Sequence, residues 1–252
     1  MRIATFNILN GRSPDDDRVD VESFAKAVAD LDADVLALQE VDRNQPRSHG
    51  ADLTAVAAEA MGAPAHRFVA ALAGTPGTAW VAATGAEQPD AAAYGIALLS
   101  RLPVTAWQVV RLPALRSPAP MRFSGDLLPT LVRDEPRVAV AAEVVDGERT
   151  MTVANTHLSF VPWWNGHQLR ALVRALGTAP RPLAVVGDLN MPRERAVRVS
   201  GLRSTCAVAT FPADDPREQI DHVLVEGSLQ PRHVETRRLP VSDHRALVVD
   251  LA

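Results

Sequence analysis

Short apolar runs in this sequence repeatedly end in acidic, amide or imidazole side chains. Six such clusters occur, and their polar residues are, in chain order, Asn7, Glu40, Asn155, His157, Asp188, Asn190, Asp221, Asp243 and His244. The apolar runs have the composition of buried β-strands, and the strands of a sheet can bring their ends to a common rim. We therefore expect these side chains to converge on one site.

Oxygen atoms of carboxylates and amides dominate these clusters. Hard oxygen donors of this kind suit Mg²⁺ or Mn²⁺. The single cysteine, Cys206, excludes an intramolecular disulfide and a multi-cysteine zinc site. Each cluster alone also has an ordinary structural explanation, since Asn favours turns, GDLN can form an Asx turn and SDH can cap a helix. Their recurrence at six strand ends favours a shared site with a bound Mg²⁺ or Mn²⁺.

The elements that must position these residues are mostly strands. Runs rich in Val, Ile, Leu and Ala predict strands at 2–8, 34–39, 66–72, 94–100, 104–111, 137–145, 150–157, 182–187, 220–225, 231–236 and 245–251. Helical spacing of apolar residues predicts helices at 21–31, 51–61 and 165–177. Many strands with few helices favour two packed sheets with helices outside them. The Pro-rich segment 112–136 is predicted to be a long surface loop.

Composition and charge set broad limits on the class of protein. The 252 residues are 47% hydrophobic, and neither a repeat nor a linker divides them, so we expect a single domain over 1–252. The net charge is −4 and Lys26 is the only lysine, which does not favour bulk attraction to nucleic acid. With no leader-like start and no apolar run of about 18 residues, the sequence predicts a cytoplasmic protein without stable membrane insertion. We also expect a monomer.

Taken in order, the motifs resemble the endonuclease/exonuclease/phosphatase superfamily. They are FN at 6–7, LQE at 38–40, GIALLSR at 95–101, Arg137, NTHL at 155–158, GDLN at 187–190, IDHV at 220–223 and SDHRAL at 242–247. The resemblance runs from the first predicted strand to the last. It implies an α/β fold, namely a four-layer α/β sandwich with two packed central β-sheets flanked by helices. It also implies cleavage of phosphoester bonds with a divalent metal.

The same resemblance implies which residues hold the metal and activate water. Glu40 is the main metal ligand, with Asn7 and Asp243 close by. Asp188 orients or deprotonates the attacking water, and Asn190 binds a phosphate oxygen. A metal beside the phosphate would offset the negative charge that repels a nucleophile.

A second set of residues is implied to contact the phosphate. His244 contacts the scissile phosphate, and Asp221 holds its ring, which favours the protonated imidazole because a carboxylate stabilises the charge. His157 contacts the phosphate or assists the leaving group. Arg137 resembles the phosphate-binding arginine of some members, and Asn155 is expected to contact substrate.

One position departs from the deoxyribonuclease-like pattern. Those members carry a Glu that supports the histidine corresponding to His157, whereas this chain has Tyr94 at the corresponding place, just before GIALLSR. The difference weakens a nuclease assignment. Tyr94 is expected either to contact substrate or to be an aromatic residue of the core.

Two further segments bear on the substrate. Trp163 and Trp164 closely follow the NTHL motif and are expected to border the site and contact an apolar or planar part of the leaving group. Alternatively, both rings pack on the helix that follows. The segment 40–50 places Arg43, Arg47 and His49 just after the predicted metal ligand, where they either grip an anionic substrate or belong to a solvated loop.

The sequence thus predicts a metal-dependent phosphoesterase that hydrolyses a phosphodiester of a small or lipid-like substrate by water attack. The acidic balance and the paired tryptophans favour such a substrate. A DNA or RNA endonuclease or exonuclease is the alternative among enzymes, because arginines dispersed in sequence can gather into a basic rim. A non-catalytic binding module with the same fold is the alternative from another class, and the complete set of polar residues argues against it.

Overall fold

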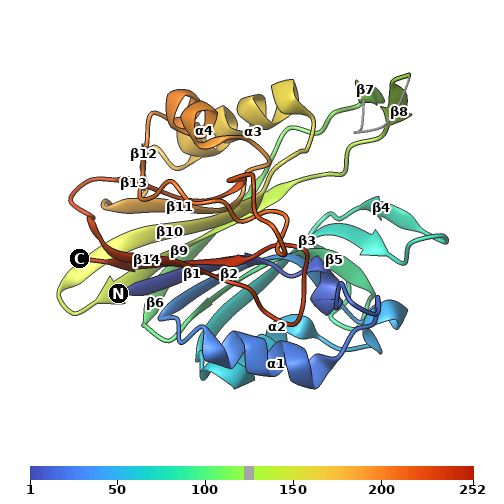
Figure 1. The fold of residues 1–252 in the computed structure, drawn as a ribbon, viewed down its shortest axis with the longest axis horizontal. Helices are drawn as coiled ribbons and strands as arrows, with labels where there is room; N and C mark the ends of the chain where they lie inside the picture. Colours follow the sequence, from blue (N-terminus) through green and yellow to red (C-terminus); the bar gives the residue numbers. More distant parts are fainter. Residues whose placement is uncertain (122–127) are drawn as a thin grey trace.

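Two β-sheets pack face to face in the computed structural model, which describes residues 1–121 and 128–252 (Figure 1). One sheet has seven strands in the order β14-β15-β1-β2-β5-β3-β4, and the other has six in the order β12-β13-β11-β10-β9-β6. Within each sheet one pair is parallel, β1 with β2 and β10 with β11, and the other neighbours are antiparallel. The parallel pairs carry the polar strand ends that the sequence singles out.

The strands follow the predicted runs closely. The seven-stranded sheet consists of β14 (Pro231–Arg237), β15 (Ala246–Leu251), β1 (Arg2–Asn7), β2 (Val35–Arg43), β5 (Ala93–Ser100), β3 (Ala65–Gly74) and β4 (Trp80–Ala82). The six-stranded sheet consists of β12 (Arg203–Ser204), β13 (Asp221–Glu226), β11 (Leu183–Asp188), β10 (Arg149–His157), β9 (Val138–Asp146) and β6 (Val104–Arg111).

Helices cover the outer face of each sheet (Figure 1). The helices α1 (Val21–Asp30) and α2 (Leu53–Met61) lie against the seven-stranded sheet, and α3 (Pro162–Ala175) and α4 (Arg193–Ser200) lie against the six-stranded sheet. Two short 3₁₀ helices, η1 (Leu9–Gly11) and η2 (Pro46–Ser48), complete the set. Helix, sheet, sheet and helix layers make the four-layer α/β sandwich that the sequence predicts.

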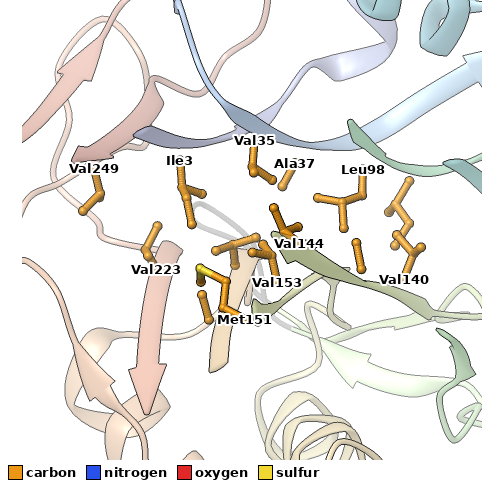
Figure 2. Packing of buried hydrophobic residues seen from close by; sticks show 14 of the residues in the cluster. Ile3, Val35, Ala37, Leu98, Val140, Val144, Met151, Val153, Val223 and Val249 are labelled. Atoms are coloured by element: carbon orange, nitrogen blue, oxygen red, sulfur yellow. The ribbon is translucent and has the colours of Figure 1, made fainter. Parts of the chain in front are cut away.

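The core between the sheets explains why the strands can be predicted from the sequence. Ile3, Val35 and Leu98 of one sheet meet Val140 and Val153 of the other (Figure 2). Alternate residues of the same strands pack on the outer helices, so both faces of a strand are apolar. Each large aliphatic side chain buried in this way contributes about 1.5–3 kcal/mol.

Several local predictions differ from the structure, and the short strands β4 and β12 lie outside the predicted runs. The segment 112–136 is not a plain loop, because β7 (Ala119–Met121) pairs with β8 (Thr130–Val132); residues 122–127 lie outside the described residues. The helix α4 was missed because its sequence, RERAVRVS, buries only Ala196 and shows little apolar periodicity. The strand β2 continues to Arg43 instead of ending at residue 39. Among the helices described, none has the length and apolar character to cross a membrane.

Candidate active site

A cavity of about 600 Å³ opens at the rim where β1, β10 and β11 end and β13 begins. Its walls are Asn7, Glu40, Tyr94, Glu135, Arg137, His157, Phe160, Asp188, Asn190, Phe211, Glu218, Ile220, Asp243 and His244. Most of the predicted site residues therefore converge, as strand ends at one rim should. Asp221 lies directly behind His244, whereas Asn155, Trp163 and Trp164 are not part of the wall.

Glu40 reaches this cavity because β2 bulges at its position. The pairing of β2 with β5 shifts between Leu38 and Val41, and Glu40 takes a left-handed φ of 56°. A bulge breaks the regular alternation of a strand and re-aims a side chain. The acidic residue thus points to the rim although the strand runs on beyond it.

Asn7, at the end of β1, links two carboxylates. Its Nδ2 donates to Glu40 Oε1 and to Asp188 Oδ2, both at 3.1 Å. Its Oδ1 accepts a hydrogen bond from the Leu9 N–H at 3.2 Å. An amide oxygen has two lone pairs, and Asn7 Oδ1 accepts this one hydrogen bond among the described residues, so the expected role of Asn7 at the metal stays a prediction. Its amide nitrogen fixes the positions of Glu40 and Asp188.

The GDLN motif is both an Asx turn and part of the site. The backbone N–H of Asn190 donates to Asp188 Oδ1 at 2.9 Å, and Asn190 takes a φ of 50°. A Cβ at Gly187 would lie 1.9 Å from the Thr156 carbonyl oxygen, so only glycine allows β11 to approach β10 here. Asn190 Nδ2 donates to the Leu158 carbonyl at 3.0 Å, which holds the amide beside the cavity.

The SDHRAL motif presents His244 through a serine turn. Ser242 has a φ of 76°, and its hydroxyl donates to the Asn7 carbonyl at 2.6 Å and accepts from the His244 N–H at 3.0 Å. His244 Nδ1 lies 3.0 Å from Asp221 Oδ2, which also accepts from the Thr210 hydroxyl at 2.6 Å. Two different segments therefore fix the imidazole.

Asp188 and His244 face each other, with 3.9 Å between Asp188 Oδ2 and His244 Nε2. Burial lowers the pKa of His244, but Asp221, followed by Asp188 and Asp243, raises that pKa to about 10. Burial and the charge of Asp221 raise the pKa of Asp188 to about 7, against the opposing effect of His244. The site thus holds an imidazolium beside a carboxyl group that titrates near neutral pH, an arrangement suited to acid–base chemistry.

His157, at the end of β10, is a neutral imidazole in this site. Burial, then the charges of Arg137 and His244, hold its pKa well below the usual value. Its Nε2 lies 3.5 Å from Asp188 Oδ2 and 3.2 Å from Asn190 Nδ2. A neutral ring can donate or accept a hydrogen bond at the phosphate, but it lacks the additional proton of an imidazolium and so does not act as a general acid.

Arg137 supplies a cation to the wall of the cavity. The side chain is 6% exposed, and its Nη2 lies 3.7 Å from both Asp134 Oδ1 and Glu135 Oε2. These distances are too long for hydrogen bonds, and Arg137 Nε has no hydrogen-bond partner within residues 1–121 and 128–252. The guanidinium therefore keeps donors for an anionic ligand.

Tyr94 lines the cavity instead of packing entirely in the core. Its ring lies 5.6 Å from the Trp80 ring, and the Arg47 guanidinium sits 5.5 Å from its centroid. Burial, and then the charges of Glu40 and Glu135, raise the pKa of its hydroxyl well above the usual value. The hydroxyl therefore stays protonated and can donate a hydrogen bond.

Asn155 does not reach the cavity, which corrects its expected contact with substrate. The residue is fully buried, and its Nδ2 donates to the carbonyls of Leu38 at 2.9 Å and Ala97 at 2.8 Å. Its Oδ1 accepts from Gln39 Nε2 at 2.8 Å. Because Asn155 belongs to one sheet and its partners belong to the other, the amide joins the two sheets.

The paired tryptophans begin α3 and do not line the cavity, so the structure does not bring them to the border of the site as expected. Trp163 is 58% exposed. Trp164 Nε1 donates to the Pro113 carbonyl at 3.0 Å, and its ring stacks on His167 with centroids 4.7 Å apart. Trp164 therefore anchors the segment after β6 to the helix, and Phe160 is the aromatic residue of this stretch that faces the cavity.

Glu40 and Asp243 are the oxygen donors that fit a divalent cation. Burial raises the pKa of Glu40, and the charge of Asp243 adds a smaller increase. Asp243 Oδ1 is buried and has no hydrogen-bond partner in the described part of the chain. Asp188, Asp221 and His244 also bring ligand atoms within 4.8 Å of one another, but a protonated His244 has no free lone pair for a metal.

Several residues of the site could not be recognised from sequence. Phe160 and Phe211 form apolar wall, and the Phe211 ring lies 4.9 Å from the His244 ring. Glu135 and Glu218 are further acidic residues of the wall. Phe160 follows NTHL by two residues and was within reach of the motif, whereas the segment with Phe211 carries no pattern that indicates its place.

A family profile and several solved structures match this chain. The profile described as "Endonuclease/Exonuclease/phosphatase family" matches residues 4–244. A comparison with curated proteins finds no matching sequence. A solved endonuclease/exonuclease/phosphatase structure from Beutenbergia cavernae aligns over 100% of this chain and 71% of its own, with a TM-score of 0.72 and 24% identity.

Two solved structures with named activities share the fold. The mannosyl-6-phosphatase Bt3783 of Bacteroides thetaiotaomicron aligns over 100% of this chain and 99% of its own, with a TM-score of 0.61 and 14% identity. Sphingomyelinase C from Streptomyces griseocarneus aligns over 99% and 98%, with a TM-score of 0.63 and 16% identity. At these identities the likeness shows the fold alone.

Proposed function

Because this chain belongs to the endonuclease/exonuclease/phosphatase family, whose members are hydrolases of phosphoester bonds, we propose that it is a divalent-metal-dependent phosphodiesterase for a small or lipid-like substrate. The observation that carries the proposal is the facing pair of Asp188 and His244 in one cavity with Glu40 and Asp243. A binding module would not need a buried imidazolium beside a carboxyl group that titrates near neutral pH.

Each residue of the pair has a role that follows from its protonation. Asp188, once ionised, accepts a proton from the attacking water. His244 is protonated and donates a hydrogen bond to a phosphoryl oxygen, so negative charge that develops in the transition state meets a fixed cation. Asp221 keeps the ring oriented and charged. General acid–base groups of this kind contribute about 10²–10⁴-fold to the rate.

The remaining residues hold the phosphate and the cation. Arg137 and Asn190 offer N–H donors at the wall, and Tyr94 offers a hydroxyl. Glu40 and Asp243 would hold Mg²⁺ or Mn²⁺, which supplies positive charge that offsets the charge of the phosphate when it is bound.

The surroundings of the cavity favour a small or lipid-like ester over nucleic acid. Phe160, Phe211 and Ile220 give the wall an apolar part, and Glu135 and Glu218 add acidic side chains to it. In the described residues, Arg137 is the only arginine or lysine in the wall. A polyanionic chain relies on many cations to neutralise its phosphates, so this cavity suits it poorly.

The proposal is tested by hydrolysis of bis-p-nitrophenyl phosphate, a p-nitrophenyl monoester, sphingomyelin and single- and double-stranded DNA and RNA at matched phosphoester concentration. Each assay is run with Mn²⁺, with Mg²⁺ and with chelator. We expect metal-dependent cleavage of diesters, with small or lipid diesters preferred to nucleic acid. Turnover that is equal in chelator and metal, or absent with every ester, would contradict the proposal, and preferred cleavage of nucleic acid would favour the nuclease alternative.

A further inference from the structure

Three arginines line a second cavity, of about 480 Å³, beside the open edges of the two sheets. Arg43 comes from the end of β2, Arg67 from β3 and Arg111 from the end of β6. The remaining wall consists of Phe68, Val69, Ala70, Thr84, Gly85, Glu87 and Val109. We propose that this cavity binds a phosphate-type oxyanion, at a site separate from the catalytic cavity.

The positive charge of this cavity is not neutralised by neighbouring acids. Within residues 1–121 and 128–252, neither Arg43, Arg67 nor Arg111 forms an ion pair. Glu87 is the only acid of the wall among the described residues, and its carboxylate accepts hydrogen bonds from the Thr84 hydroxyl at 2.9 Å and the Gly85 N–H at 2.9 Å. It therefore caps its own turn, and the cavity keeps a net positive charge.

The side chain of Arg43 is held in place, and its guanidinium keeps N–H donors that are available to a ligand. Its guanidinium carbon lies 4.8 Å from the centroid of the Phe68 ring, which restrains the side chain through a cation–π contact. Its Nε is buried without a hydrogen-bond partner in the described residues, and its Nη2 makes only a long contact of 3.5 Å with the Gln88 carbonyl. A buried, unpaired donor is costly unless a ligand satisfies it, and guanidinium groups match the geometry of phosphate oxygens.

Arg111 reaches toward the turn that Glu87 caps. A Cβ at Gly85, which has a φ of 93°, would lie 2.9 Å from Arg111 Nη2. The absence of a side chain at this position leaves room for the guanidinium beside the turn. The turn and the two sheet edges thus form a wall around the three cations.

This oxyanion site flanks the catalytic cavity without sharing a wall residue with it. Arg43 follows Glu40 by three residues on β2, which is a span of roughly 10 Å in a strand. Arg111 precedes Leu112, whose N–H donates to the Arg137 carbonyl at 3.0 Å. The ligand is therefore either a second phosphate group of the substrate or free phosphate bound beside the site.

The competing explanation is that the arginines only protect open strand edges. The pairing of β4 with β3 covers Leu72–Gly74, and β6 is the last strand of its sheet. Charged side chains on such edges discourage pairing with other chains. That role requires charge at the edge but no affinity for phosphate, so the two explanations differ in a measurable way.

The test is calorimetric titration of inorganic phosphate into the metal-free protein in chelator. Arg67 and Arg111 are exposed, so the Arg67→Gln/Arg111→Gln variant should fold normally. The matched control, Arg170→Gln/Arg198→Gln on α3 and α4, removes the same charge from exposed positions elsewhere. We expect the cavity variant to bind one phosphate fewer than the wild type, or to bind it at least ten-fold more weakly, and the control to bind like the wild type.

Equal phosphate binding by the cavity variant and the wild type would overturn the proposal, as would an equal loss in the control. The Arg43→Gln variant removes the buried donor, and its phosphate binding is measured in the same way after circular dichroism has shown that it folds. These binding measurements do not depend on catalysis, so their failure is distinct from failure of the proposed function.

Kinetics then distinguish the two sources of the oxyanion. If the site takes a second phosphate of the substrate, a diester that also carries a phosphomonoester has a lower KM than the same diester without it. The cavity variant then loses that advantage. If the site takes free phosphate, the two diesters have equal KM values in the wild type, and only the titration reports the site.

Discussion

His244 and Asp221 form a buried pair in which Nδ1 of the imidazole lies 3.0 Å from Oδ2 of the carboxylate. The pair joins the loop before β15 to the start of β13. Burial lowers the pKa of His244, and Asp221, with smaller contributions from Asp188 and Asp243, more than reverses this effect and raises the pKa to about 10. Asp221 is therefore the largest single cause of the charge on His244 at neutral pH.

Replacing Asp221 should move the alkaline limit of activity. His244 is needed in its protonated form, so activity should be lost as pH rises through about 10 in the wild type. In Asp221→Asn only Asp188 and Asp243 still offset the lowering effect of burial, so this limit should move to lower pH, with kcat at pH 8 reduced by about 10²-fold. The measurement is a pH profile of kcat/KM, with exposed Asp146→Asn as the matched control. An unchanged alkaline limb would show that Asp221 does not control the imidazole.

Asp188 should set the acidic limit in the same profile. Its pKa of about 7 means that the carboxylate needed to accept a proton is lost as pH falls below 7. Asp188→Asn and His244→Ala should each lower kcat by about 10²-fold or more while circular dichroism stays native. The double variant should lose less than the two single losses combined, because the groups act together. Near-normal turnover of either single variant would mean that the facing pair is not catalytic.

Metal binding at Glu40 should be visible without any assay of activity. A divalent cation that binds only the folded protein stabilises it by about 2.7 kcal/mol at 100 times its Kd. Mn²⁺ should therefore raise the melting temperature of the wild type, and Glu40→Gln should lose most of that rise. Exposed Glu59→Gln on α2 is the matched control and should respond like the wild type. The same Mn²⁺ response in Glu40→Gln would place the cation elsewhere.

Asn155 should affect stability and not substrate affinity. Its amide makes three hydrogen bonds between the sheets, to Leu38, Gln39 and Ala97. Asn155→Leu removes them and leaves buried polar partners unpaired, at about 1–3 kcal/mol for each group that stays unsatisfied. Denaturant unfolding should show a loss of this order, with KM for bis-p-nitrophenyl phosphate unchanged in the folded protein. A raised KM with wild-type stability would restore the substrate contact first expected from sequence.

The fold could be predicted because its strands are buried on both faces and its motifs mark where they end. The same logic brought Asp188 and His244 to one cavity, since residues beside strand ends share a rim. Glu40 also reaches it, but through a bulge within β2, which continues to Arg43. The logic failed for Asn155. Strand alternation puts Asn155 on the same face of β10 as His157, but Asn155 lies two residues further from the rim and is buried between the sheets. The spacing of residues along a strand does not show how far each residue lies from the rim.

The positions of the aromatic and basic residues were harder to predict from sequence, for a different reason. Trp163 and Trp164 stood out because of their size, but the turn that begins α3 carries them past the cavity and leaves Phe160 facing it. Arg47 and Arg43, four residues apart, also separate in space. Arg47 is fixed by Asp42, whereas Arg43 turns to the second cavity. The positions of these side chains depend on tertiary contacts, which a local sequence pattern does not reveal.

Phe160 and Trp163 should differ in their effects on substrate affinity. Phe160 is half-buried in the cavity wall, whereas Trp163 is 58% exposed outside it. An aromatic side chain that a substrate covers contributes about 1.5–3 kcal/mol, and about 1.4 kcal/mol corresponds to a ten-fold change in affinity. Phe160→Ala should therefore raise KM for a diester with an apolar leaving group by about ten-fold or more. Its effect on dimethyl phosphate, which lacks such a group, should be small, and Trp163→Ala should leave KM and the melting temperature near wild type for both esters. A larger rise in KM from Trp163→Ala than from Phe160→Ala would show that the apolar part of the substrate extends over α3 instead.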